Sequence, residues 1–494
     1  MNTKKQYFFP RVPQIVLTVF GICTLLFGCF QESLWFDEAY TVGIVQHNWT
    51  ELLRISVSDV HPPLYYLMLK LFCEVFGYSL PVMRVFSALG AILLGIVGIT
   101  HIKPKFGNEW GFWFTFISFT TAAILFYALE IRMYTWAMLF VTLTAFYAFL
   151  IYENGGTKKQ RALFLVFSVL SAYTHHFALF TVSIINLFFL KRWWKNKETI
   201  KLWYKMASVQ LLAYIPGALV FLGQILSGGA SWISIQWPDV VFDLFAYPFL
   251  GDTVANVAKK GSVLYSVLGG VFLLGFLVVT AFLFGLYKKD KEKYRPAICA
   301  FAVYFSVVGF TLFVSLFRVI YYIRYTMVIM GLVVFVLAGI MAALKKWQKI
   351  LVSIGLVALF LIQAFGIFSL VYDPSGRADT DYIDSLIEEG DIFLISDFNA
   401  YRITAKYGEH KVYFYNKDKW NIHTAYQALG KDSVVIDELQ GSHIDGFKGR
   451  VWLAGRDDCY DYLMSKGKCR EISSKWINMK YHNGNLEVIL VEIY

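Results

Sequence analysis

Four ionisable side chains lie in one segment between two strongly apolar stretches of the chain. Asp37 and Glu38 follow Leu34-Trp35-Phe36, and Asp59 and His61 come about twenty residues later. If helical structure leads the chain away and back, we expect the two groups to face one cleft. Together they could supply a general base or hold a hard divalent cation such as Mg²⁺ or Mn²⁺. The alternative is structural: the two acids cap a helix, whose N-terminal dipole favours negative charge, and His61 shapes a turn.

Cationic side chains suited to a phosphate group lie near the ends of other apolar stretches. The candidates are Arg84, Arg132, Arg324 and His175, with Arg318 as a further one. Arginine suits this role because its planar fork of donors matches two phosphate oxygens at once. The alternatives are an ion pair for Arg84 and Arg132, snorkelling at a helix end for Arg318 and Arg324, and a plain polar turn for His175.

The elements that position these side chains are apolar helices. The chain has 494 residues, of which 57% are hydrophobic and 16% charged. Its apolar runs are close to the roughly 20 residues that cross a bilayer as a helix, and they do not alternate as barrel strands do. Eleven spans are predicted, at residues 13–31, 80–101, 110–127, 133–152, 162–175, 177–190, 207–226, 263–286, 297–316, 325–343 and 350–371. Two of the turns between them are expected near residues 127–132 and 174–176.

The net charge of +10 is explained by where the basic residues lie. With the N-terminus in the cytoplasm, most Lys and Arg fall on the inner loops, which is the usual bias of membrane proteins. These basic loops are residues 103–105, 158–161, 191–205, 288–295 and 345–349. The bilayer is therefore the expected environment, and the charge gives no reason to expect a nucleic-acid partner.

Three regions are predicted to lie outside the membrane on the opposite side from the basic loops. The first outer loop, residues 32–79, carries the acids, and its residues 64–76 predict a helix in the membrane interface because thirteen residues are short for a crossing. Residues 227–262 contain Trp232 and Trp237, which are typical of an aromatic belt and could instead contact a sugar. The third region is the C-terminal one.

The C-terminal region predicts a small α/β domain at residues 372–494, following a transmembrane domain at residues 1–371. Buried strands are expected at residues 392–396, 411–415, 433–437 and 451–454, and a helix at residues 457–465. Cys459 and Cys469 could pair there, whereas the other four cysteines suit apolar packing. The expected fold is thus an all-α polytopic membrane protein with about eleven transmembrane helices and an extracytoplasmic α/β domain.

A resemblance to a known superfamily rests on the first loop. Asp37-Glu38 directly after the first span, followed by Asp59-Val60-His61-Pro62-Pro63-Leu64, resembles the GT-C glycosyltransferases. The similar members are the glycosyltransferase family 39-like enzymes, namely protein O-mannosyltransferases and the transferase that puts aminoarabinose on lipid A. Segments 130–134, 173–176 and 324–325 also resemble bacterial members. The likeness covers the layout of residues 1–371 and leaves the C-terminal domain unmatched.

The resemblance implies a transferase at the outer face of the cell membrane. Its donor would be a monosaccharide on a polyprenyl phosphate, and its acceptor a hydroxyl of a protein, a lipid or a cell-wall glycan. Asp37 would be the general base of an inverting displacement, with Glu38 beside it. Asp59 and His61 would contact the acceptor or sugar or share a possible divalent cation, and Arg84, Arg132, Arg324 and His175 would bind the donor phosphate. No cofactor is certain.

Two functions of other classes remain open on the sequence. A transporter or flippase of lipid-linked sugars would also need many spans and buried charges, but paired halves with broken helices are its usual mark, and no internal duplication is visible. A membrane sensor would use the helices only to anchor its C-terminal domain, for which eleven spans and a long acidic loop are excessive. The polar groups cluster at the outer ends of spans, which favours an interfacial enzyme.

Overall fold

The structure is a computed structural model of residues 1–494, and it consists of two compact units. It describes the whole chain except residues 1–10, 32–33, 154, 227–232, 236, 238, 260, 372–380, 398–399, 418–428, 431 and 480–483. The first unit, here called the helical unit, comprises residues 1–29 and 84–367. The second, the loop–sheet unit, comprises residues 30–83 and 368–494. The chain therefore enters the loop–sheet unit twice, once early and once at its end.

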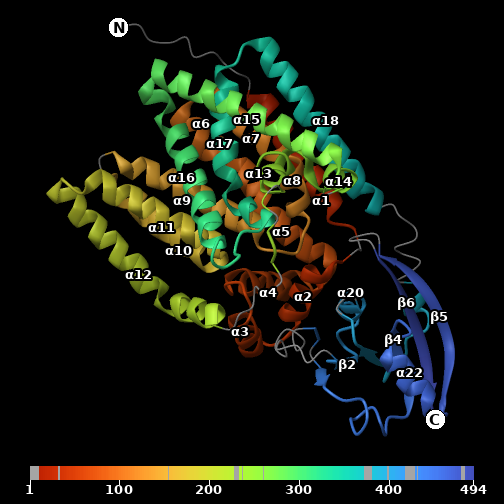
Figure 1. Ribbon diagram of the computed structural model, residues 1–494. Helices are drawn as coiled ribbons and strands as arrows, with labels where there is room; N and C mark the ends of the chain where they lie inside the picture. The colour runs from red at the N-terminus through yellow and green to blue at the C-terminus, as the bar shows by residue number, and fades with distance from the viewer. Residues whose placement is uncertain are drawn as a thin grey trace. The chain divides into compact units, whose positions relative to one another are not determined.

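The helical unit is built almost wholly from long apolar helices (Figure 1). Its elements up to the middle of the chain are α1 (Arg11–Gly28), α5 (Leu80–Val97), the π-helix η1 (Gly98–Ile102), α6 (Lys103–Phe106), α7 (Asn108–Thr120), α8 (Ala122–Ala128), α9 (Tyr134–Tyr152), α10 (Lys158–Thr174), α11 (His176–Trp193) and α12 (Lys197–Leu226). The later ones are α13 (Asp239–Phe245), α14 (Tyr247–Val257), α15 (Val263–Lys289), α16 (Lys291–Ser315), the 3₁₀-helix η2 (Ile323–Ile329), α17 (Met330–Ala343) and α18 (Lys346–Val371).

All eleven predicted spans coincide with helices, but they differ in length and apolarity. Among the described residues, seven helices are long and apolar enough to cross a membrane, or eight if the bent pair α7 and α8 counts as one span. That pair bends by 63° between Thr120 and Ala122. The segments α1, α10 and α11 fall outside this set. A polytopic helical membrane protein is thus confirmed, and the count of eleven crossings stays a prediction.

Close helix packing in this unit depends on small residues and threonines. A Cβ atom at Gly98 would collide with Thr115 Oγ1, and one at Gly90 would lie 2.7 Å from Thr135 Oγ1. The same threonines bridge the helices, because Thr115 Oγ1 donates to the Gly95 carbonyl over 3.0 Å and Thr135 Oγ1 donates to an α5 carbonyl over 2.6 Å. This arrangement is typical of helices packed within a bilayer, where small residues allow backbones to approach. It fixes α5 against both α7 and α9.

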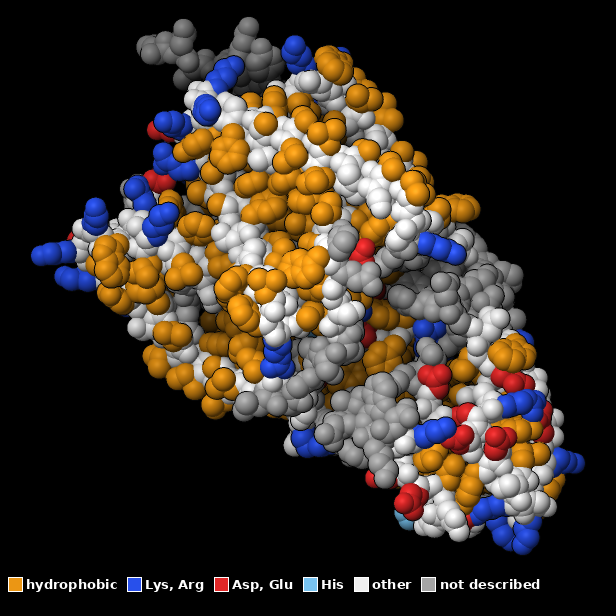
Figure 2. Space-filling view, viewed as in Figure 1, with side chains coloured by type: hydrophobic (Ala, Val, Ile, Leu, Met, Phe, Trp, Pro, Cys, Tyr) orange, Lys and Arg blue, Asp and Glu red, His pale blue; other side chains and the backbone are white. Residues whose placement is uncertain are grey.

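Basic side chains of the helical unit gather at one end. Figure 2 shows Lys and Arg side chains along one edge, where Figure 1 has the ends of α11, α12, α15 and α16, while hydrophobic side chains are spread over the rest of the visible face. The two expected turns also appear: α8 ends at Ala128 before α9 begins at Tyr134, and α10 ends at Thr174 before α11 begins at His176. The basic end is the one that the charge pattern predicts to face the cytoplasm, and the orientation itself stays a prediction.

The loop–sheet unit combines three helices of the first loop with a sheet domain from the C-terminal region. The helices are α2 (Phe36–Gln46), α3 (Trp49–Ser58) and α4 (Leu64–Phe76). The sheet domain contains β1 (Ile392–Ile395), α20 (Tyr401–Thr404), β2 (Lys411–Tyr415), β3 (Ser433–Ile436), β4 (Gly449–Ala454), α22 (Asp458–Ser465), β5 (Cys469–Met479) and β6 (Gly484–Ile493). The helical excursion expected between the acids is therefore α2 and α3, and the expected interfacial helix is α4.

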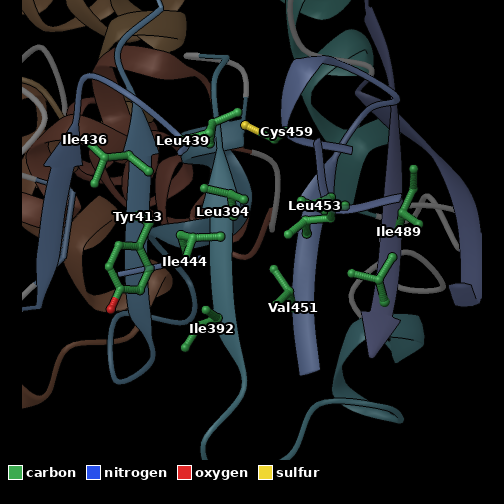
Figure 3. Packing of buried hydrophobic residues seen from close by; sticks show 12 residues of the cluster. Ile392, Leu394, Tyr413, Ile436, Leu439, Ile444, Val451, Leu453, Cys459 and Ile489 are labelled. Atoms are coloured by element: carbon green, nitrogen blue, oxygen red, sulfur yellow. The ribbon is translucent and has the colours of Figure 1, made fainter. Parts of the chain in front are cut away.

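The sheet has the strand order β3-β2-β1-β4-β6-β5. The first four strands are parallel, and β6 runs antiparallel to both β4 and β5. Its core gathers apolar side chains from β1, β2, β4 and β6, as Figure 3 shows for Leu394, Tyr413, Leu453 and Ile489. All four strands read as short continuous apolar runs, which made them predictable, although β1, β2 and β4 are largely buried and the edge strand β3 is only partly buried.

The two cysteines of this domain are not bonded to each other. Cys459 and Cys469 are both free thiols, the first buried and the second partly exposed. Cys459 lies in the apolar core and Cys469 packs at its margin. The pairing that the sequence left open is therefore not formed, and both thiols serve as small apolar packing groups.

Candidate active site

Asp37 and Glu38 lie in the first turn of α2, where the helix dipole favours acids. Glu38 turns back to the start of the helix, and its carboxylate accepts a hydrogen bond from the Trp35 backbone N–H over 3.4 Å. Its side chain is 1% exposed, whereas Asp37 is only half-buried. The capping role proposed for both acids therefore applies to Glu38. Asp37, one position earlier, keeps part of its surface accessible.

Asp59 and His61 mark the return of the first loop. Asp59 ends α3, and its carboxylate accepts a hydrogen bond from the Tyr66 hydroxyl over 3.1 Å. His61 is buried just before Pro62 and Pro63, after which α4 begins at Leu64. Since α2 packs against both α3 and α4, the loop forms a compact helical cluster around the acids. The tight turn at the two prolines positions His61 at the base of α4.

Lys70 joins the ends of this helical cluster. Its side chain is buried, and its Nζ donates to the Val45 carbonyl in the last turn of α2 over 3.2 Å and to the Tyr78 hydroxyl over 3.1 Å. It also pairs with Glu74 at 3.5 Å and lies over the ring of Trp49. A cation is favourable at a helix C-terminus. The charges that interrupt the apolar run of α4 therefore hold α2 in place.

The C-terminal domain contributes residues to the same cluster, which the sequence did not predict. Phe36 stacks on Tyr401 with ring centres 5.5 Å apart, and Gln46 Nε2 donates to the Ala405 carbonyl over 3.3 Å. Arg402, which is 7% exposed, lies within electrostatic range of Glu38 and Asp397. The helix α20 thus lies against the helix that carries Asp37.

The charge of Arg402 is held in a buried setting. Burial lowers the pKa of its guanidinium, and the nearby carboxylates of Asp397 and Glu38 act in the opposite direction. Because Glu38 is itself buried, each group offsets the cost of burying the other. No short motif marks Arg402 in the sequence, since its partner lies more than three hundred residues earlier in the chain.

In the helical unit, Arg84 and Arg132 lie at the turn between α8 and α9. Arg84 is fully buried on α5, and its Nε donates to the Leu129 carbonyl over 3.1 Å. Arg132 is also buried, and its backbone N–H donates to the Glu130 carbonyl over 2.8 Å. The bond from Arg84 to the Leu129 carbonyl gives Arg84 a structural role in holding the turn. A contact of either arginine with a phosphate stays a prediction.

His175 and Arg324 approach the same turn from two other elements. The His175 ring lies 6.0 Å from that of Tyr134 and 5.0 Å from that of Tyr325, and His175 is within electrostatic range of Arg132. His175 Nδ1 also accepts a hydrogen bond from the Phe177 backbone, so it caps α11. Arg324, next to Tyr325 in η2, is within electrostatic range of Tyr127. The structure thus brings the predicted cations together around residues 127–134.

Other predicted residues fall away from this cluster. Arg318 is exposed and donates to the Ile225 carbonyl over 2.9 Å. Trp237 is exposed, while Trp232 lies outside the described residues. Among the described residues, no three His, Cys, Asp or Glu side chains are placed together as metal ligands. A divalent cation shared by Asp37, Glu38, Asp59 and His61 stays a prediction.

Two crystal structures of ArnT from Cupriavidus metallidurans resemble the chain over nearly its whole length. The apo structure superposes with a TM-score of 0.63 and 12% identity, covering 97% of this chain and 98% of ArnT. The structure bound to undecaprenyl phosphate gives 0.65 and 11%, covering 97% of each. The chain has the fold of ArnT. The expected GT-C type fold is thereby confirmed, and the likeness to ArnT continues through the C-terminal domain, where the sequence resemblance had ended.

The other comparisons add little to this result. The Saccharomyces cerevisiae protein O-mannosyltransferase Pmt1-Pmt2 complex bound to the sugar donor matches with a TM-score of 0.34 and 19% identity. That match covers 48% of this chain and 36% of the other, too little to bear on the fold. No family model matches the chain, and no curated protein matches it.

Proposed function

We propose that the chain is an integral membrane glycosyltransferase. It moves a monosaccharide from a polyprenyl-phosphate donor to an acceptor hydroxyl at the outer face of the cell membrane. The observation that carries this proposal is the likeness to ArnT over 97% of both chains, because one of those ArnT structures holds undecaprenyl phosphate. The first-loop motif with Asp37 in the first turn of α2 supports the same function independently.

Asp37 is the proposed general base. It is the half-buried member of the acidic pair, whereas the Glu38 carboxylate bonds to the Trp35 backbone at the helix start. In the proposed step Asp37 takes the proton of the acceptor hydroxyl as that oxygen forms a bond to the anomeric carbon. The bond from this carbon to the phosphate oxygen breaks, and its electron pair leaves with the polyprenyl phosphate. Attack from the face opposite the phosphate inverts the configuration.

The cations around residues 127–134 are the proposed partners of the phosphate. A phosphate leaves without a strong general acid, so the protein's task is to stabilise the charge that develops on it. Arg132 and Arg324 suit this role through paired N–H donors, and His175 lies beside Arg132. Arg84 is a proposed positioning residue, because its hydrogen bond to the Leu129 carbonyl fixes the turn that carries Arg132.

The C-terminal domain is proposed to select the acceptor or to cover the cleft. Its support is the contact of α20 with α2, through the stacked rings of Phe36 and Tyr401 and the hydrogen bond from Gln46. Any movement of α20 would therefore change the contacts of α2, the helix that carries Asp37. The acceptor class stays open among a protein, a lipid and a cell-wall glycan.

The test compares wild type with Asp37→Asn in detergent, using a set of radiolabelled polyprenyl-phosphate monosaccharides and a membrane-extract acceptor. A positioned base contributes about 10² to 10⁴ in rate, so turnover should fall by that factor. Glu51→Gln is the matched control, because Glu51 is an acid of the same loop that forms a surface pair with Arg54. Its turnover should stay within about twofold of wild type, since exposed pairs contribute little.

Two outcomes would overturn the assignment. Normal turnover by a folded Asp37→Asn protein would remove Asp37 from the mechanism. Donor binding by wild type with no sugar release or transfer, and equal binding by Asp37→Asn, would replace the transferase with a transporter or flippase of lipid-linked sugars.

A further inference from the structure

An apolar cavity of about 460 Å³ lies at the basic end of the helical unit. Its walls come from η1, α6, α9, α11, α16 and α17, and nearly all of its lining is aliphatic or aromatic. The exceptions at its rim are Lys191 and Arg192, the last basic residues of α11. A cavity of this size falls in the range of about 300–1,000 Å³ that small ligands occupy. We call it the basic-end cavity.

The depth of the cavity matches one leaflet of a bilayer. Along α9 its lining runs from Tyr152, the last residue of the helix, to Thr142. Ten residues of helix correspond to roughly 15 Å. This is half of the roughly 30 Å hydrocarbon core. The cavity therefore begins at the membrane surface and ends near the midplane, which is the reach of a single acyl chain.

The rim of the cavity carries an excess of positive charge. Glu153 pairs with Arg295 at 2.7 Å and with Arg192 at 3.6 Å, so one carboxylate serves two guanidinium groups. Lys191 adds a further cation at the same rim, and no carboxylate of the described residues pairs with it. Three cations face one acid. An anion that enters the rim thus finds a net positive charge directly above an apolar cavity.

The rim is also held in a fixed shape. Trp193 Nε1 donates to the Tyr152 carbonyl over 3.0 Å and so joins the end of α11 to the end of α9. Arg192 lies over the ring of Tyr152 with 5.9 Å to its centre. A preformed rim lowers the ordering cost of binding. Figure 2 shows that basic side chains continue along this edge of the helical unit, so an anionic headgroup would be attracted before it binds.

From these observations we propose that the basic-end cavity binds one anionic phospholipid of the leaflet facing the basic loops. One acyl chain fills the cavity, and the headgroup phosphate is held by Lys191 and Arg192. Basic pockets between transmembrane helices on the cytoplasmic side are suited to such headgroups. A polyprenyl chain is much longer than the cavity is deep. The site is separate from the proposed donor site, because its walls include none of the residues placed around 127–134.

The test measures lipid binding rather than sugar transfer, so it is independent of the proposed function. Delipidated full-length protein in detergent is mixed with palmitoyl-oleoyl phosphatidylglycerol or with the zwitterionic phosphatidylcholine of the same chains. Retained lipid is counted by native mass spectrometry. We expect phosphatidylglycerol to bind at least about fivefold more tightly, because each Lys or Arg near an anionic lipid contributes roughly that factor. Equal retention of the two lipids would overturn the proposal.

Variants locate the binding in the cavity. Lys191→Ala should weaken phosphatidylglycerol binding about fivefold, whereas Lys195→Ala, an exposed lysine of the same segment outside the lining, should change it less than twofold. Ala302→Phe narrows the cavity from α16 and should abolish tight binding. Ala145→Phe narrows it from α9, and it serves in place of Ala302→Phe if that protein does not fold. If a folded variant with a narrowed cavity bound phosphatidylglycerol as tightly as wild type, the proposal would be overturned.

A competition experiment distinguishes a phospholipid from a polyprenyl phosphate as the lipid that occupies the cavity. Undecaprenyl phosphate added in excess should leave phosphatidylglycerol bound in wild type, because the polyprenyl chain is much longer than the cavity is deep. Displacement of phosphatidylglycerol in wild type but not in Lys191→Ala would assign the cavity to the polyprenyl carrier and overturn the proposal for a phospholipid.

Discussion

At the scale of residues, two neighbouring acids have taken different roles. Glu38 is buried, bonds to the Trp35 backbone and lies in the field of Arg402, while Asp37 keeps part of its surface accessible. The sequence predicted both as site residues because acids beside an apolar span are costly there. It could not assign their roles, since these depend on Arg402, whose place beside Glu38 is set by a contact between distant parts of the chain.

The coupling between Glu38 and Arg402 can be measured by a double-mutant cycle. Removing either charge alone leaves the other buried with less compensation, so Glu38→Gln and Arg402→Met should each destabilise the protein, and the double variant less than their sum. We expect a coupling of about 1–3 kcal/mol, measured by SDS-induced unfolding in mixed micelles. The exposed pair Glu51 and Arg54 is the control and should give at most about 0.5 kcal/mol. Equal couplings for both pairs would show that the buried pair has no special role.

At the scale of elements, the parallel strands and most helices follow from their apolar patterns, while β5 does not. In β5, polar and charged residues such as Arg470, Glu471 and Lys475 interrupt the run because the strand lies at the edge of the sheet. A half-exposed edge strand gives a weaker signal than a strand buried on both faces. The helix α4 was predictable in extent, but the reason for its internal charges, Lys70 and Glu74, is visible only in its packing against α2.

Lys70 offers a test of how α4 holds α2. In Lys70→Met the buried Val45 carbonyl loses its donor, and a buried group left without a partner costs about 1–3 kcal/mol. We therefore expect a lower midpoint of thermal unfolding and reduced sugar transfer, because α2 carries Asp37. Lys468→Met, at an exposed lysine of the sheet domain, should change neither. A Lys70→Met protein as stable as wild type would show that Lys70 is not needed to hold α2.

At the scale of the whole molecule, each compact unit is made of two segments that are separate in the sequence. Residues 30–83 group with residues 368–494 rather than with the helices on either side of them. Composition changes sharply at residue 372, which made a boundary visible there, whereas a first loop that packs against a distant domain leaves no compositional mark. The predicted cations all belong to the helical unit, and the predicted acids to the loop–sheet unit.

The predicted orientation can be tested by cysteine labelling of intact cells, in a background whose native cysteines are replaced. Lys195→Cys lies at the basic end and should react with a membrane-impermeant maleimide only after the cells are opened. Lys468→Cys, on the sheet domain, should react from outside without opening. The reverse pattern would place the basic end outside. It would then move both the acids and the basic-end cavity to the opposite faces from those proposed.

The hydrogen bond from Gln46 to Ala405 joins residues 359 positions apart. A ribosome adds about 5–20 residues per second, so α2 leaves the membrane roughly 20–70 seconds before its partner α20 exists. During synthesis the residues of α2 that later contact α20 therefore remain without those partners for this time. A chain halted between the end of α18 and residue 400 would have all the helices of the helical unit but not the contact of α2 with α20.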